Sequence, residues 1–166
     1  MRFVVPGTVS AEHQELHVRL SEAARLDGPV GDAARAVERL LQPHFVREEQ
    51  VALPPLALLK AAAEGTVTPD MAEVFELTDA LERAMPRLLA EHQEIVGALL
   101  VFSDLAGREG RPECVRFAAR LIQHLRTEEA VLYPAAVLVG RYLKLVLPGL
   151  DEAGAGRSTA HGAGRV

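Results

Sequence analysis

A duplicated histidine pattern constrains this chain more than any other feature. The stretch Ala-Glu-His-Gln-Glu occurs at 11–15 and again at 90–94, and His-x-x-x-Glu-Glu occurs at 44–49 and at 124–129. The first pair of positions differs by 79 residues and the second by 80. Such equal spacing indicates two half-length units, each with one histidine helix and one histidine-carboxylate helix. The pattern therefore predicts a pseudo-twofold arrangement around a dinuclear metal site.

The rest of the chain is typical of helices. Ala, Leu, Glu and Arg dominate, apolar residues recur at helical spacing, and Gly and Pro separate the apolar stretches. We expect helices at about 10–27, 32–51, 56–64, 69–106 and 113–146, with Ser10 and Asp32 as N-caps, a kink or junction at Pro86 and a break at Pro134. Residues 1–148 are thus predicted to form an all-α, antiparallel up-and-down four-helix bundle with a pseudo-twofold internal repeat and a short accessory helix. Residues 149–166 are expected to form a disordered tail.

Composition narrows the class of protein. A length of 166 residues suits one domain, and a net charge of −5 with scattered Lys and Arg argues against nucleic-acid binding. The longest apolar run, 95–102, is far shorter than the roughly 18 residues that span a bilayer, so we expect no membrane segment. The single cysteine, Cys114, excludes an internal disulfide and fits a cytoplasmic location.

Helical geometry places several of these side chains together. Residues i and i+4 lie on one helix face, which pairs His44 with Glu48 and His124 with Glu128. Imidazole binds iron, zinc and other transition metals, and a carboxylate can span two cations. A buried, unpaired carboxylate costs several kcal/mol, which a metal would remove. The predicted ligands are His13, His17, His44, Glu48, His92, His124 and Glu128.

Other motifs fit less well. The Glu-x-x-His signature of carboxylate-rich di-iron bundles is missing, and Gln14 rather than Glu follows His13, so the zincin motif is missing too. The simpler alternative is that each histidine is exposed or satisfied within its helix. For His17 in particular, exposure to solvent remains open. Cys114 and Tyr133 are predicted to be core or surface residues, with a redox role for Tyr133 as the alternative.

Taken in order, the four motifs resemble those of the hemerythrin-like proteins, the HHE cation-binding family. The resemblance covers about residues 10–140 and includes the Leu-Tyr-Pro sequence at 132–134. It implies a non-haem di-iron centre with bridging carboxylates and an oxo or hydroxo bridge, which handles dioxygen or a related ligand such as nitric oxide or peroxide. The residue types themselves do not exclude zinc or manganese.

One departure from the oxygen-carrying members affects the expected ligand assignment. Carriers have His-x-x-x-His on the third helix, whereas here that spacing lies on the first helix, at His13 and His17, and Val96 takes the third-helix position. The resemblance then implies one iron held by His13, His17 and His44 and a second, with the open position, held by His92 and His124. Glu48 and Glu128 would bridge the two irons, with Glu49 and Glu129 next to the ligands or at the surface.

The functional expectation is a binding or sensing protein for dioxygen, nitric oxide or peroxide. Two alternatives remain: a di-iron oxidoreductase acting on peroxide, and an iron-responsive interaction module. A metal-free helical adaptor would be the simplest competitor. No feature of the sequence identifies a protein partner or an oligomeric state.

Overall fold

The structure is a computed structural model that describes the backbone of residues 3–158 and the side chains of residues 3–148. Within these residues all regular structure is helical and there is no strand, so the all-α prediction is confirmed. The α-helices are α1 (Gly7–Ala24), α2 (Gly28–Arg47), α3 (Leu59–Glu64), α4 (Phe75–Arg108), α5 (Pro112–Thr127) and α6 (Tyr133–Ser158).

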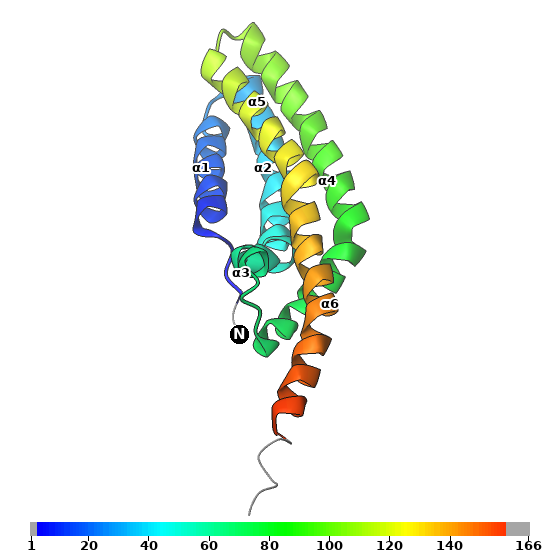
Figure 1. Cartoon of the computed structure of the whole chain (residues 1–166). Coiled ribbons are helices and arrows are strands. Elements are labelled where there is room, and N and C mark those ends of the chain that lie inside the picture. Colours follow the sequence, from blue (N-terminus) through cyan, green and yellow to red (C-terminus); the bar gives the residue numbers. More distant parts are fainter. Residues whose placement is uncertain (1–2, 159–166) are drawn as a thin grey trace, which may run out of the picture.

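Four long helical segments form the predicted bundle. Figure 1 shows α1, α2, α4 and the α5–α6 segment running alternately up and down, with the short α3 at one end of the bundle. Two 3₁₀ turns, η2 (Pro54–Leu58) and η3 (Pro69–Val74), flank α3. The prediction of a tail at 149–166 stays a prediction, because the side chains beyond 148 and the backbone beyond 158 lie outside the described residues.

A π-helical turn follows each His-x-x-x-Glu motif. These turns are η1 (Glu48–Ala52), between α2 and the 3₁₀ turn η2, and η4 (Glu128–Leu132), between α5 and α6. In each turn the backbone N–H of the fifth residue beyond the glutamate, Leu53 or Tyr133, donates to that glutamate's carbonyl oxygen. An isolated π-turn inserts one residue into the helical repeat and is frequent at functional sites. The two turns are therefore matched features of the two halves.

Several helix boundaries differ from the expected ones. Helix α1 begins at Gly7, with Pro6 rather than Ser10 at the N-cap. Helix α2 begins at Gly28 rather than Asp32, with Pro29 in its first turn, where a proline lacks no helical hydrogen bond. Helix α4 continues through Pro86.

Helical structure also continues through Pro134, so the break predicted there is wrong, whereas Pro86 lies inside one long helix. Pro134 lies in the first turn of α6, immediately after the π-turn, where the geometry already departs from a regular helix. By length and composition alone, the continuous helix Pro112–Pro148 could cross a membrane. The same helix carries His124, Glu128 and Tyr133, whose side chains are buried in the bundle interior, so part of its apolar surface belongs to the bundle core. The expectation of no membrane segment stays a prediction.

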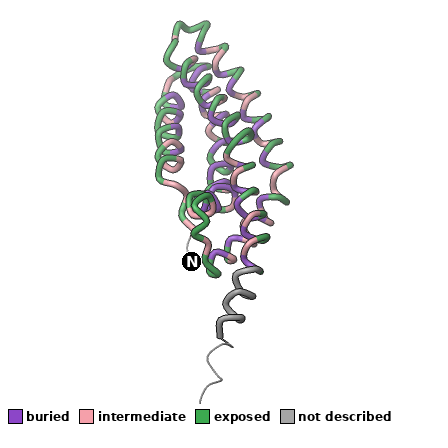
Figure 2. The backbone as a smooth tube through the Cα atoms, in the orientation of Figure 1, coloured by how far each residue is buried: buried purple, intermediate pink, exposed green. Residues whose placement is uncertain are grey.

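The apolar core is divided around a polar layer. Figure 2 shows buried positions along the inner sides of the long helices. One apolar cluster includes Leu41, Ile95 and Leu125, and a second includes Leu53 and Leu88. Along α2, α4 and α5, the histidines and glutamates of the duplicated motifs fall between residues of these two clusters. The core thus holds the polar layer between two apolar layers that limit access of water.

Candidate metal centre

Six of the seven predicted ligands meet in this polar layer. Each of the four bundle segments supplies one histidine, and each π-turn begins with one glutamate; the residues are His13, His44, His92, His124, Glu48 and Glu128. The histidines are at most 5% exposed and both glutamates are fully buried. They form two groups that could each hold a metal ion: His44, Glu48, His92 and Glu128, and His13, His124 and Glu128.

Both carboxylates lie between the two groups. Oε1 of Glu128 is 3.2 Å from Nε2 of His13 and 2.9 Å from Nε2 of His124, while its Oε2 is 3.6 Å from Nε2 of His92. Oε2 of Glu48 is 3.4 Å from Nε2 of His44 and 3.9 Å from Nε2 of His13. Each carboxylate therefore contacts histidines of both groups, as a bridging ligand must.

Each of the four histidines directs its other ring nitrogen, Nδ1, at a carboxylate. The Nδ1 pairs are His13 with Glu49 at 3.2 Å, His44 with Glu91 at 3.1 Å, His92 with Glu129 at 2.8 Å and His124 with Glu12 at 3.5 Å. A carboxylate partner assigns the proton to Nδ1 and leaves the lone pair on Nε2, the arrangement found around histidines that bind metals. All four Nε2 lone pairs then point into the centre.

The inward-facing atoms fit a cation better than they fit one another. Oε2 of Glu48, Nε2 of His124 and Oε2 of Glu128 are buried and have no hydrogen-bond partner among the described residues. Nε2 of His124 is close to Glu128, but the contact lacks hydrogen-bond geometry. Nε2 of His44 and Nε2 of His92 lie only 2.8 Å apart, so their lone pairs oppose each other unless a proton or a metal lies between. The donor set of imidazoles and carboxylates suits transition-metal ions.

Burial controls the charges of these groups in the absence of a metal. Burial, and then the negative charge of Glu128, raise the pKa of Glu48 well above its usual value. Burial lowers the pKa of His44 to about 4, in spite of its contact with Glu91. Burial also opposes ionisation of Glu128, but its close contacts with His124 and His13 outweigh burial and lower the pKa of that carboxyl. His44 is thus neutral at pH 7, which is the form that binds metal.

Comparison with known families accounts for this set of residues. The model of the hemerythrin HHE cation-binding domain matches residues 7–136, well over half of the chain. The chain belongs to the hemerythrin HHE family. The match to the hemerythrin domain spans all six clustered residues and both π-turns. No curated protein and no solved structure matches the chain.

The structure differs from two expectations about this hemerythrin-like centre. His17 is exposed and belongs to neither group, because the buried face of α1 follows Leu16 and Leu20 and leaves His17 at its edge. The histidines also pair across the two halves of the chain, His44 with His92 and His13 with His124, rather than within them. Extent of helix packing does not decide this grouping, since α1 packs far more extensively along α2 than along α5, yet His13 groups with His124.

Tyr133 contacts the clustered residues, although the sequence predicted chiefly a core or surface position for it. Its side chain is 1% exposed, and its hydroxyl donates a hydrogen bond to Oε1 of Glu48 and lies 3.1 Å from Nε2 of His92. Burial and the charge of Glu48 raise the pKa of Tyr133 far above its usual value, so in the metal-free protein the phenol keeps its proton. Glu12 and Glu91 were also not assigned a role, although each immediately precedes a histidine of the duplicated motif.

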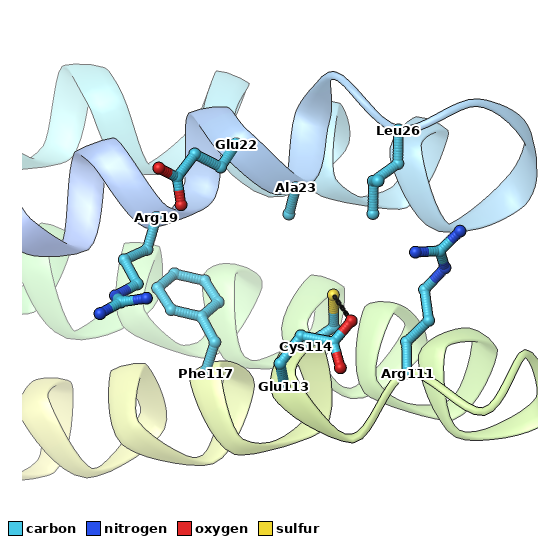
Figure 3. Close-up of a pocket in the computed structure, with 8 residues that line it drawn as sticks. All are labelled: Arg19, Glu22, Ala23, Leu26, Arg111, Glu113, Cys114 and Phe117. Carbon is cyan, nitrogen blue, oxygen red and sulfur yellow. Dashed lines mark hydrogen bonds between the residues drawn. The ribbon is translucent and has the colours of Figure 1, made fainter.

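Two surface hollows of the bundle differ in their distance from the clustered histidines and glutamates. One, of about 430 Å³, adjoins the centre, since its walls include His13, His17, Phe45 and Glu49. The Phe45 ring stacks on the His13 ring, with centroids 4.0 Å apart, and both side chains line the hollow. A second hollow between α1 and the start of α5 contains Cys114 and none of the clustered residues (Figure 3). Of these two hollows, the first is thus the one placed to give a small molecule access to the centre.

Proposed function

We propose that this chain is a non-haem di-iron protein that binds or senses dioxygen, or the related ligands nitric oxide and peroxide. The observation that carries the proposal is the convergence of four imidazole Nε2 atoms and two carboxylates in a buried layer, where three of those atoms have no hydrogen-bond partner among the described residues. Family membership supports a cation at this place. The identity of the metal as two irons with an oxo or hydroxo bridge is part of the proposal.

Each of the two ions would be bound by its own pair of histidines. His44 and His92 would bind one ion, His13 and His124 the other, and Glu128, with Glu48, would bridge them. Iron at these positions supplies the electrons that a bound small ligand reversibly accepts. The chain contributes a fixed set of donors between two apolar layers, where charge interactions are stronger than in water.

The outer carboxylates orient the imidazoles. A carboxylate that accepts the Nδ1 proton holds the ring in one orientation and makes Nε2 more basic, and loss of such a partner typically costs 10- to 100-fold in metal affinity. Glu91 is itself anchored by Arg47 at 3.2 Å and Arg87 at 2.9 Å. We therefore expect the His44 ring to be the most rigidly placed of the four.

Oxygen binding tests the proposal directly. Protein loaded with iron and reduced without oxygen should develop a visible absorption band on mixing with dioxygen in a stopped-flow instrument. The band should disappear when oxygen is removed. A His44→Ala, His124→Ala double variant should lose both the iron and the band, whereas His161→Ala keeps both, because His161 lies outside the duplicated motifs.

The same measurement separates the alternatives. Irreversible oxidation with steady consumption of peroxide would favour a di-iron oxidoreductase over a carrier or sensor. Protein from iron-rich medium that binds no iron, or binds zinc or manganese in its place, would contradict the proposal.

A further inference from the structure

We propose that Oη of Tyr133 is a further metal ligand, completing the position formed by His44, His92 and Glu48, and that the exogenous ligand binds at the opposite position, formed by His13 and His124. The inference rests on the proposed function, since it concerns iron held in this centre. It makes the two metal positions unequal in a way that the histidines alone do not.

The position of the Tyr133 hydroxyl is that of a donor atom. It lies 3.1 Å from Nε2 of His92, which lies 2.8 Å from Nε2 of His44, and it is hydrogen-bonded to Glu48. These separations are similar to those that group the histidines and glutamates with one another. The Tyr133 side chain is 1% exposed, so its hydroxyl is directed at the centre and not at solvent.

The π-turn explains why a residue this far beyond Glu128 reaches the centre. On a regular α-helix, residues five apart differ by about 140° around the axis, so Tyr133 would point away from Glu128. The i→i+5 hydrogen bond of η4 widens the turn and brings Tyr133 back toward the side of Glu128. The local backbone therefore aims both oxygen donors into the same layer.

The matched position in the first half has no donor. Leu53 follows Glu48 by five residues, just as Tyr133 follows Glu128, and it closes a π-turn with the same hydrogen bond. Leu53 is fully buried and apolar. Because the chain carries a phenol in one half and an aliphatic side chain in the other, only one metal position gains a tyrosine oxygen.

The opposite position has both fewer donors and better access. Its close group consists of His13, His124 and Glu128, with Oε2 of Glu48 at 3.9 Å from Nε2 of His13. The surface hollow of about 430 Å³ reaches this side, because His13 and the stacked Phe45 form part of its wall. A small ligand entering there would meet the less occupied ion first.

Coordination by Tyr133 is a simple exchange of a proton for a metal bond. The phenol O–H bond breaks, the proton leaves to solvent, and the phenolate oxygen forms a bond to the ion; no electron is transferred. A bound cation favours the deprotonated form of its ligands, which overcomes the burial that keeps the phenol protonated without metal.

Iron(III) bound to phenolate has a characteristic signature, a charge-transfer absorption in the visible with resonance-enhanced tyrosine ring vibrations. The chain has two tyrosines, Tyr133 and the half-buried Tyr142 on α6, which gives a matched control. Ferric wild-type protein and the Tyr142→Phe variant should show the signature, and Tyr133→Phe should lose it. If Tyr133→Phe does not fold, retention of the signature in Tyr142→Phe still assigns it to Tyr133.

Azide added to the ferric protein tests the open position. We expect His13→Ala to retain about one iron with the phenolate signature and to lose the azide band, since its ligand-binding ion is removed. Wild-type protein that holds two irons without a phenolate signature, or a signature that persists in Tyr133→Phe, would overturn the inference while the proposed function stands. Protein that binds no iron would instead overturn the proposed function.

Discussion

Replacing Glu48 by Gln is expected to stabilise the metal-free protein and to weaken the metal-loaded one. In the metal-free state, Oε2 of Glu48 is buried without a hydrogen-bond partner, 3.4 Å from Nε2 of His44. The Nδ1 proton of His44 is directed at Glu91, so Nε2 has a free lone pair. An amide at position 48 can donate an N–H to that lone pair and keep a carbonyl oxygen as the acceptor for Tyr133.

The size of the effect follows from these contacts. A buried polar atom without a partner costs about 1–3 kcal/mol, so Glu48→Gln should raise the metal-free free energy of unfolding by about that amount. For a chain of this size, the melting temperature then rises by roughly 2–4 °C per kcal/mol. An amide bridges two cations poorly. Since an ion at 100 times its dissociation constant adds about 2.7 kcal/mol, the variant should lose roughly that much of the stabilisation by metal.

The gain from Glu48→Gln should depend on pH. Because the folded protein raises the pKa of Glu48, the stability that this carboxyl contributes is fully present below its unfolded value near 4.5 and is lost as pH rises through the folded value. Gln has no such dependence. The stability difference between variant and wild type should therefore be smallest near pH 4 and should increase toward pH 7.

Urea unfolding of chelator-treated and iron-loaded protein at several pH values measures both effects. Glu64→Gln, on the exposed surface of α3, is the matched control and should change neither. The reasoning is refuted if metal-free Glu48→Gln is no more stable than wild type at pH 7, or if iron stabilises both proteins equally.

Three other predictions test the site and the packing. Glu128 belongs to both groups, so Glu128→Ala should bind less iron than His124→Ala. Elemental analysis should find about one ion per chain in His124→Ala. Equal iron contents in the two variants would contradict the role of Glu128 as a shared ligand. His17→Ala should leave the iron content unchanged, because the side chain is exposed, and a loss of one ion would restore His17 as a ligand. A Cβ at Gly31 would lie 1.8 Å from a backbone carbonyl oxygen, so Gly31→Ala should lower the free energy of unfolding in urea by about 1–3 kcal/mol. Gly97 on α4 faces open space, so Gly97→Ala should raise that free energy by about 0.5–1 kcal/mol. The reverse order of the two variants would contradict the packing.

The sequence could predict the ligands that depend on regular helix geometry. His44 with Glu48 and His124 with Glu128 share faces because residues four apart lie together on any α-helix. The same rule does not tell how wide the buried face of α1 is, and in the structure His17 is exposed although His13 is buried. The grouping of histidines could not be predicted either, because it depends on how the four helices are placed in three dimensions, which helical spacing within one helix does not give.

The position of the Tyr133 side chain next to the centre could not be predicted from helical periodicity, for a different reason. Its side chain reaches the centre only because a π-turn interrupts the helix after Glu128, and the regular 3.6-residue spacing of apolar side chains does not indicate such a turn. Helix starts were missed in a similar way. Gly28-Pro29 fits either the end of one helix or the beginning of the next, and in the structure Pro29 lies in the first turn of α2.

Anomalous diffraction at the iron absorption edge, from crystals of iron-loaded protein, tests the account most directly. The account predicts two iron peaks, one next to Nε2 of His44 and His92 and one next to Nε2 of His13 and His124, with the Glu128 carboxylate between them. Iron-loaded crystals with no peak in this layer, or with a single peak elsewhere on the bundle, would contradict it.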